Sequence, residues 1–147
     1  VMFGPKNFGF SEEQVEANSM KALEQVKMLE FIDKPPHHLS FGQKRKIAIA
    51  SVLASEPELL VLDEPSSNLD PASRRELIDI LKNLKVSIIL VTHDLPMALE
   101  ICNRSIILNN GQITADADTY KILKDSKVME ENRLELPFGF ALHHLEE

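Results

Sequence analysis

The chain has 147 residues, of which 44% are hydrophobic and 27% are charged, and its formal net charge is −7. A chain of this length can form one domain that buries about two-thirds of the surface of its unfolded state. No apolar run approaches the roughly eighteen residues of a membrane-spanning helix, and the acidic balance argues against general attraction to nucleic acid or anionic lipid.

The N-terminal third is predicted to be mainly helical. Residues 1–10 are rich in Gly and Phe and predict an irregular segment. Ser11 and Gln14 have the spacing of a capping box, which begins a helix that continues through Leu29, before the prolines at 35–36 break the pattern. The apolar residues expected on the buried face of this helix are Val15, Met20, Leu23 and Val26.

Ser40 is predicted to begin a second helix, which ends near residues 55–57. The apolar residues expected to define it are Ile47, Ile49, Val52 and Leu53.

Residues 59–62 are a continuous apolar run, which predicts a strand of a parallel sheet with both faces buried, and residues 86–91 predict a second buried strand. Between them, Asp70 and Pro71 indicate a helix start, with a capping carboxylate followed by proline at the first helical position. The resulting β–α–β order predicts an α/β fold.

The C-terminal part continues with short elements. Asp94 and Pro96 predict another helix, and residues 105–108 and 112–115 predict a hairpin around Asn109-Asn110-Gly111. A helix is expected around residues 120–123, and the role of the tail that follows does not emerge from the residues.

Two adjacent carboxylates, Asp63 and Glu64, follow the first predicted strand. Open α/β sheets bind ligands at the carboxyl ends of their strands. Because successive strand residues point to opposite sides, these carboxylates can perform different tasks. The alternative interpretation is an ordinary polar strand end.

Ser40, Gly42 and Gln43 lie at a predicted helix start, where free backbone N–H groups attract phosphate. Gly42 lets a ligand approach the backbone closely. The alternative is an ordinary Ser-capped helix. His93 follows the second strand, and a lone histidine at such a position is usually structural; its place about thirty residues after Asp63 fits one βαβ unit.

Other candidate sites are weaker. His37-His38 and His143-His144 are adjacent pairs without a completing ligand set and favour solvated histidines over a metal site. Lys44-Arg45-Lys46 and Arg74-Arg75 favour solvated helix faces over nucleic-acid binding. Cys102, the single cysteine, favours packing and fits a reducing, cytoplasmic compartment.

Four segments in order resemble the signature motif, Walker B strand, D-loop and switch histidine of ABC-type ATPases. They are Leu39-Ser40-Phe41-Gly42-Gln43, Leu59-Leu60-Val61-Leu62-Asp63-Glu64-Pro65, Ser67-Asn68-Leu69-Asp70 and Thr92-His93-Asp94. Phe41 departs from the commonest form of the family, which has Gly there.

The resemblance implies ATP and Mg²⁺ as cofactors and a role for each matching residue. Asp63 would hold the magnesium, and Glu64 would be the general base. His93 would contact the γ-phosphate, and Asp70 would couple two nucleotide sites. Ser40, Gly42 and Gln43 would cover the γ-phosphate of the nucleotide bound to a partner subunit.

The phosphate-binding motif G-x-x-x-x-G-K-[ST] occurs nowhere in the 147 residues. The sequence therefore resembles only the C-terminal portion of such an ATPase, without Walker A and Q-loop, and we expect this chain alone to be inactive. The expected fold is a truncated P-loop NTPase (RecA-like) core with a parallel sheet, plus the helical subdomain of ABC proteins. The expected boundaries are about 11–55 for the helical subdomain, about 56–118 for the α/β core and about 119–147 for a C-terminal extension.

Residues 1–10, the segment Pro35-Pro36-His37-His38 and the tail around Leu136-Pro137-Phe138 resemble the ATPases of cobalt/nickel importers and energy-coupling-factor vitamin importers. This resemblance implies a second ATPase subunit, transmembrane transporter subunits, no nucleic acid, and a peripheral location on the cytoplasmic face of the membrane. It leaves the transported solute open.

Two alternatives remain. One is a non-transport ABC ATPase of DNA maintenance or translation, although the helical segment before the signature-like motif is too short for the long coiled coil usual in the DNA-maintenance type. The other is a catalytically inactive interaction module.

Overall fold

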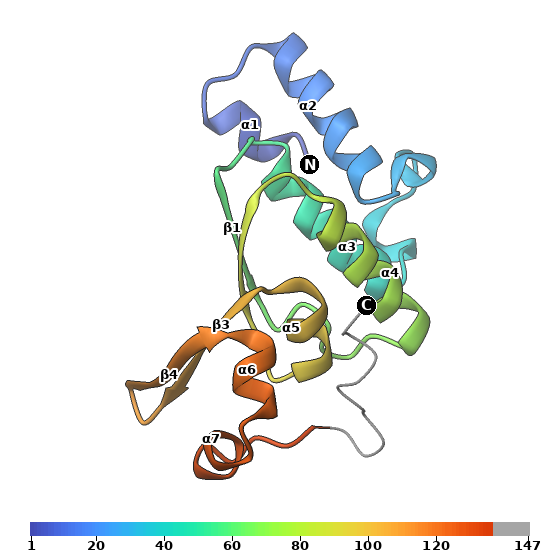
Figure 1. Ribbon diagram of the computed structural model, residues 1–147. Coiled ribbons are helices and arrows are strands. Elements are labelled where there is room, and N and C mark those ends of the chain that lie inside the picture. The colour runs from blue at the N-terminus through green and yellow to red at the C-terminus, as the bar shows by residue number, and fades with distance from the viewer. Residues whose placement is uncertain (137–147) are drawn as a thin grey trace. The chain divides into compact units, whose positions relative to one another are not determined.

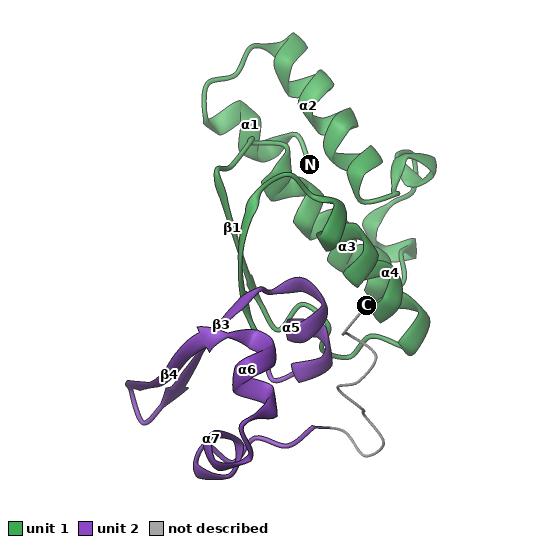
Figure 2. Ribbon diagram, in the orientation of Figure 1, with its two compact units in different colours: residues 1–91 green, residues 92–147 purple. Residues whose placement is uncertain are grey.

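The computed structural model describes residues 1–136 and divides the chain into two compact units, residues 1–91 and residues 92–147 (Figures 1 and 2). The tail from residue 137 onward, including Pro137, Phe138 and the pair His143-His144, lies outside the described residues. The subdomain boundaries expected near residues 56 and 119 stay a prediction.

The first unit contains helices and a short parallel sheet (Figure 1). Its elements are α1 (Phe3–Asn7), α2 (Glu12–Gln25), η1 (Leu29–Phe31), η2 (Pro36–His38), α3 (Phe41–Leu53), β1 (Leu59–Asp63), α4 (Pro71–Asn83) and β2 (Ser87–Val91).

The capping box predicted at Ser11 and Gln14 is confirmed, and the helix start predicted at Ser40 is a second capping box. At the start of α2, the Ser11 amide donates to Gln14 Oε1 at 3.0 Å, and the Gln14 amide donates to Ser11 Oγ at 3.3 Å. Ser40 and Gln43 form the same pair of bonds at the start of α3. Each box satisfies two N–H groups that a helix start otherwise leaves without a partner.

The prediction that residues 1–10 are irregular was wrong, because Phe3–Asn7 forms a one-turn helix. Pro5 lies in the first turn of this helix, where its missing N–H breaks no helical hydrogen bond, and its side chain is buried.

The helices bury faces that differ partly from the expected ones. Met20 on α2 and Val52 on α3 are exposed, because they lie outside the buried face of their helices. The buried residues of these two segments follow helical spacing. They are Val15, Ser19, Ala22, Leu23 and Val26 in the first, and Lys46, Ile49, Ala50 and Leu53 in the second.

Strands β1 and β2 pair in parallel, as predicted, with Val61 opposite Ile89. The expectation that both faces of the strands are buried was wrong. Leu60 and Leu62 face the core, whereas Val61 is 59% exposed and Ile89 is 49% exposed. The other side of this sheet therefore presents apolar side chains to solvent.

Up to residue 136, the second unit contains α5 (Leu95–Ile101), β3 (Arg104–Asn109), β4 (Gln112–Asp118), α6 (Thr119–Lys124) and α7 (Ser126–Glu131). The predicted hairpin is confirmed, with Asn110 and Gly111 at φ of 50° and 76°, as a tight antiparallel turn requires. Helix α7 was not predicted. Asp125 begins it by accepting hydrogen bonds from the amides of Lys127 and Val128.

Residues 1–136 contain no helix with the length and apolar composition needed to span a bilayer.

We predict that the exposed apolar face of the β1–β2 sheet causes the chain to self-associate, because exposed apolar patches on parallel sheets favour association. The double variant Val61→Thr/Ile89→Thr should reduce association in sedimentation velocity experiments, since threonine keeps the β-branched shape but adds a hydroxyl. Ile32→Thr, which alters an exposed side chain away from the sheet, is the control. Equal association of the double variant and the wild type would contradict this prediction.

Candidate functional site

Asp63 and Glu64 lie at the carboxyl end of β1, as predicted, but their surroundings differ. Asp63 is the last residue of the strand and is exposed. Glu64 has already left the strand, with a left-handed φ of 44°, and its amide donates to the Val91 carbonyl at 2.8 Å. The alternation of strand side chains therefore ends at Asp63, and the turn sets the direction of Glu64.

The Glu64 side chain is partly held by that turn. Ser67 Oγ donates to Glu64 Oε2 at 3.3 Å, and the Ser67 amide donates to the Glu64 carbonyl at 3.2 Å. A non-glycine residue in the left-handed region costs roughly 1–2 kcal/mol, and such conformations gather at functional sites. Among the described residues, five other non-glycine residues also have a positive φ, so the place of Glu64 directly after β1, together with its φ, marks it as a candidate.

Ser40, Gly42 and Gln43 lie in the first turn of α3. The Ser40 amide donates to Gln43 Oε1 at 2.9 Å, and the Gln43 amide donates to Ser40 Oγ at 3.2 Å. The polar side chains of this segment are therefore ordered by the helix start itself. Phe41 between them is half exposed, and the Arg45 guanidinium lies 5.5 Å from the centre of its ring.

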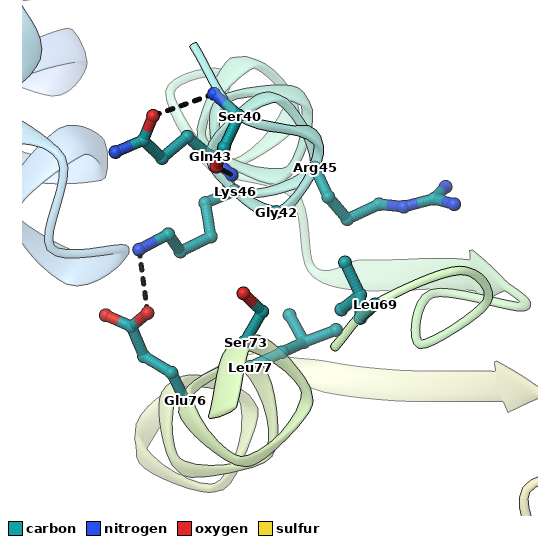
Figure 3. Close-up of a pocket in the computed structure, with 9 residues that line it drawn as sticks. All are labelled: Ser40, Gly42, Gln43, Arg45, Lys46, Leu69, Ser73, Glu76 and Leu77. Carbon is teal, nitrogen blue, oxygen red and sulfur yellow. Dashed lines mark hydrogen bonds and ion pairs between the residues drawn. The ribbon is translucent and has the colours of Figure 1, made fainter. Parts of the chain in front are cut away.

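Helices α3 and α4 lie side by side, and a pocket of about 150 Å³ opens between their N-terminal turns (Figure 3). Lys46 points across the pocket from α3 toward Glu76 on α4, while Arg45 extends in another direction (Figure 3). Leu69, from the segment before α4, contributes to the lining. The pocket thus joins two segments that the sequence singled out separately.

Lys46 is buried, which corrects the expectation that the basic run 44–46 is a solvated face. Its side chain is only 11% exposed, and its Nζ lies 3.0 Å from Oε2 of Glu76, whose side chain is 40% exposed. A charged group in such a place needs a partner of opposite charge. Sequence reasoning missed both residues, although the spacing of Lys46 from Ile49, Ala50 and Leu53 places it on the buried stripe of α3.

Asp70 caps α4, as predicted. Its Oδ1 accepts hydrogen bonds from the amides of Ala72 and Ser73 at 3.1 and 3.0 Å, and its Oδ2 accepts from Ser73 Oγ at 2.6 Å. These bonds, the Ser73 hydroxyl first, lower the pKa of the Asp70 carboxyl below its ordinary value. The carboxylate is therefore fixed in its charged form at the start of the helix.

Thr92, His93 and Asp94 belong to the second unit, where they form the turn into α5. Thr92 Oγ1 accepts from the Asp94 amide at 3.0 Å, and Asp94 Oδ1 accepts from the Met97 amide at 3.0 Å. The His93 carbonyl accepts from the Leu95 amide at 3.0 Å, and its side chain is exposed. The structure thus gives this histidine an exposed place on an ordered turn.

Two other candidates lie within residues 1–136, the His37-His38 pair and Cys102. His37 and His38 are exposed and pack against each other edge to face. Cys102 is half-buried, and this burial raises the pKa of its thiol. Within residues 1–136, no three His, Cys, Asp or Glu side chains come together as a metal-holding group.

Comparison with known proteins finds a family model and several similar proteins. A family model described as "AAA domain, putative AbiEii toxin, Type IV TA system" matches residues 32–100. A "Putative ABC transporter ATP-binding protein" of Streptomyces avermitilis is 61% identical over 140 residues, which cover 95% of this chain and 53% of that protein. The "Energy-coupling factor transporter ATP-binding protein EcfA2" of Mycoplasmopsis pulmonis is 45% identical over 141 residues, covering 93% of this chain and 46% of that protein.

A solved structure extends the similarity to the fold. The structure of cbiO1 from Clostridium perfringens, described as part of the ABC transporter complex cbiONQ, matches with a TM-score of 0.76 and 33% identity. The match covers 92% of this chain and 56% of that one. The chain therefore spans about half the length of the relatives that it matches.

We predict that Glu76→Gln lowers the free energy of unfolding by about 1–2 kcal/mol in urea denaturation at neutral pH, because it leaves the buried Lys46 charge without a countercharge. Glu76 is partly exposed, so the cost should stay below that of a fully buried pair. Asp79→Asn on the same helix is the matched control, since its pair with Arg75 is about half exposed and should contribute less than about 0.5 kcal/mol. An equal cost for the two variants would contradict this prediction.

Proposed function

The chain is a homologue of the ATP-binding subunits of ABC transporters and has their α/β P-loop NTPase fold over the part that it spans, and from this premise we propose that it carries the hydrolytic half of such a site. The observation that carries the proposal is Glu64, held in a left-handed conformation directly after the parallel strand β1. A carboxylate fixed there can accept a proton from the water that attacks the γ-phosphate of ATP.

Asp63 is the proposed magnesium residue. Its carboxylate is exposed at the strand end, and Mg²⁺ in nucleotide sites commonly uses one or two protein carboxylates together with water and substrate phosphate. The donor set at this position fits that requirement. When bound, the ion would neutralise phosphate charge, while Asp63 holds it in place.

The segment Leu39–Gln43 is the proposed signature motif, which would cover ATP bound to a second ATPase subunit. Its position at the start of a 13-residue helix supports this role, because backbone N–H groups and the helix dipole favour phosphate there. Ser40 and Gln43 are held in the capping box, so Gly42 and the backbone are the parts that we expect to approach the phosphate.

Asp70 and His93 complete the proposed machinery. Asp70, fixed at the start of α4, would couple the two nucleotide sites of an ATPase dimer, and the exposed His93 would contact the γ-phosphate. Both roles come from the family resemblance, and the ordered hydrogen-bonded turns around these residues support them.

The transport partner is proposed from the relatives. EcfA2 of Mycoplasmopsis pulmonis is named an energy-coupling factor subunit, and cbiO1 is described as part of a transporter complex. We infer that this chain serves an importer of that group, for cobalt, nickel or a vitamin, on the cytoplasmic face of the membrane. It would act there with transmembrane subunits and a second ATPase subunit, without nucleic acid.

An inactive interaction module is the second candidate, and the absence of G-x-x-x-x-G-K-[ST] from the sequence favours it for the chain alone. Such a module would present its Leu39–Gln43 segment to an intact ATPase. The names of the relatives support transport over DNA maintenance or translation.

We predict that Glu64→Gln in the full-length gene product, assayed with its membrane subunits, lowers ATP turnover by about 10²- to 10⁴-fold, which is about 3–5 kcal/mol of barrier. ATP binding should persist, because glutamine keeps the size of the side chain but not its basicity. His93→Ala should also abolish turnover. Glu58→Gln, an exposed residue just before β1, is the control. Near-wild-type turnover in Glu64→Gln would contradict the role of the general base.

We predict that residues 1–147 alone bind Mg-ATP with a dissociation constant well above the micromolar range in calorimetry. A micromolar site is worth only about 8 kcal/mol in total, and the lacking phosphate loop normally provides most of the contacts. The full-length Streptomyces avermitilis relative, measured in parallel, is the positive control. A low-micromolar constant for this chain would show that its nucleotide site is built from other residues.

A further inference from the structure

Gly42 has no backbone reason to be glycine. It lies in the first turn of α3, and its φ is outside the left-handed region, so an alanine could adopt the same backbone conformation. Its surroundings are the reason. A Cβ atom at this position would lie 2.9 Å from Ser73 Oγ and 3.1 Å from Ser73 Cβ, closer than nonbonded atoms pack.

The Ser73 side chain cannot move away from such a Cβ without losing a hydrogen bond. Its Oγ donates the 2.6 Å hydrogen bond to Asp70 Oδ2, so rotation of the hydroxyl away from Gly42 would break that bond. The Cβ of Ser73 would remain too close even then. The start of α3 thus approaches the side chain that fixes Asp70 so closely that a methyl group at position 42 would clash with it.

A second interaction between α3 and α4 lies one turn further along both helices. Lys46 follows Gly42 by four residues, and Glu76 follows Ser73 by three, so the Lys46–Glu76 ion pair lies on the same seam between the helices (Figure 3). The interface between α3 and α4 therefore has a close approach at Gly42 and Ser73 and, one turn further, an ion pair in which Lys46 is buried and Glu76 is partly exposed.

We propose that Ser73 is a positioning residue that couples the start of α3 to the Asp70 carboxylate, so that the two segments keep one fixed relative arrangement. The functional meaning rests on the proposed function: the segment that covers a partner's nucleotide and the segment that couples the two sites would move as one piece. A shift of either segment would then be passed to the other through Gly42 and Ser73.

Nuclear magnetic resonance on the 147-residue chain tests the coupling without any ATPase assay. Ser73→Ala removes the hydroxyl and should raise the pKa of Asp70 toward its ordinary value, measured from the side-chain carboxyl carbon. Gly42→Ala should raise it as well, although Gly42 forms no hydrogen bond with Asp70, because the new methyl group displaces the Ser73 hydroxyl. The double variant should show no further increase.

Gly4→Ala is the matched control. A Cβ at Gly4 on α1 would lie 2.7 Å from Ser55 Oγ, so this variant also forces a methyl group against a serine hydroxyl in the first unit. It should lower stability without changing the pKa of Asp70. An unchanged Asp70 pKa in Gly42→Ala, with the expected increase in Ser73→Ala, would overturn the coupling.

A second measurement avoids acid conditions. At neutral pH, Gly42→Ala should lower the melting temperature in the wild-type background but not in a Ser73→Gly background, where both the Oγ and the Cβ that obstruct the methyl group are gone. An equal decrease in both backgrounds would overturn the proposal. Because neither experiment uses ATP, a failed coupling stays distinguishable from a failed ATPase assignment.

Discussion

The packing of α3 against α4 is the constraint on which the candidate site of the first unit depends. It leaves little room for a Cβ at position 42, places Ser73 beside that glycine and buries the Lys46 side chain beside Glu76. Without this close approach, the Leu39–Gln43 segment and the Asp70 turn would be two separately capped helix starts. With it, they form one surface around a pocket (Figure 3).

Capping is the physical device that recurs at this site. Ser40 and Asp70 each satisfy the free amides at the start of a 13-residue helix, and each belongs to a segment with a proposed role in nucleotide coupling. The same side chains thus order the backbone at each helix start and belong to the segments proposed to act at the nucleotide sites. This double use explains why an ordinary capped helix and a functional motif are hard to tell apart at these positions.

The sheet differs from the helix pair, because only one of its two faces is packed against the core. Leu60 and Leu62 pack into the core, while the other face of β1 and β2 is apolar and exposed. Parallel strands normally have both faces covered. An exposed apolar face of this kind favours contact with further protein.

The sequence by itself determined the capped helices, the parallel β1–β2 pair and the hairpin at Asn110-Gly111, because these depend on local residues and short-range spacing. It also determined which residues belong to the ATPase-like motifs. Only the tertiary structure decided that Lys46 is buried, that Ser73 lies close to Gly42, and that one face of the sheet is exposed. Each of these depends on a helix or strand that is distant in sequence. The type of a residue does not indicate which distant element packs against it.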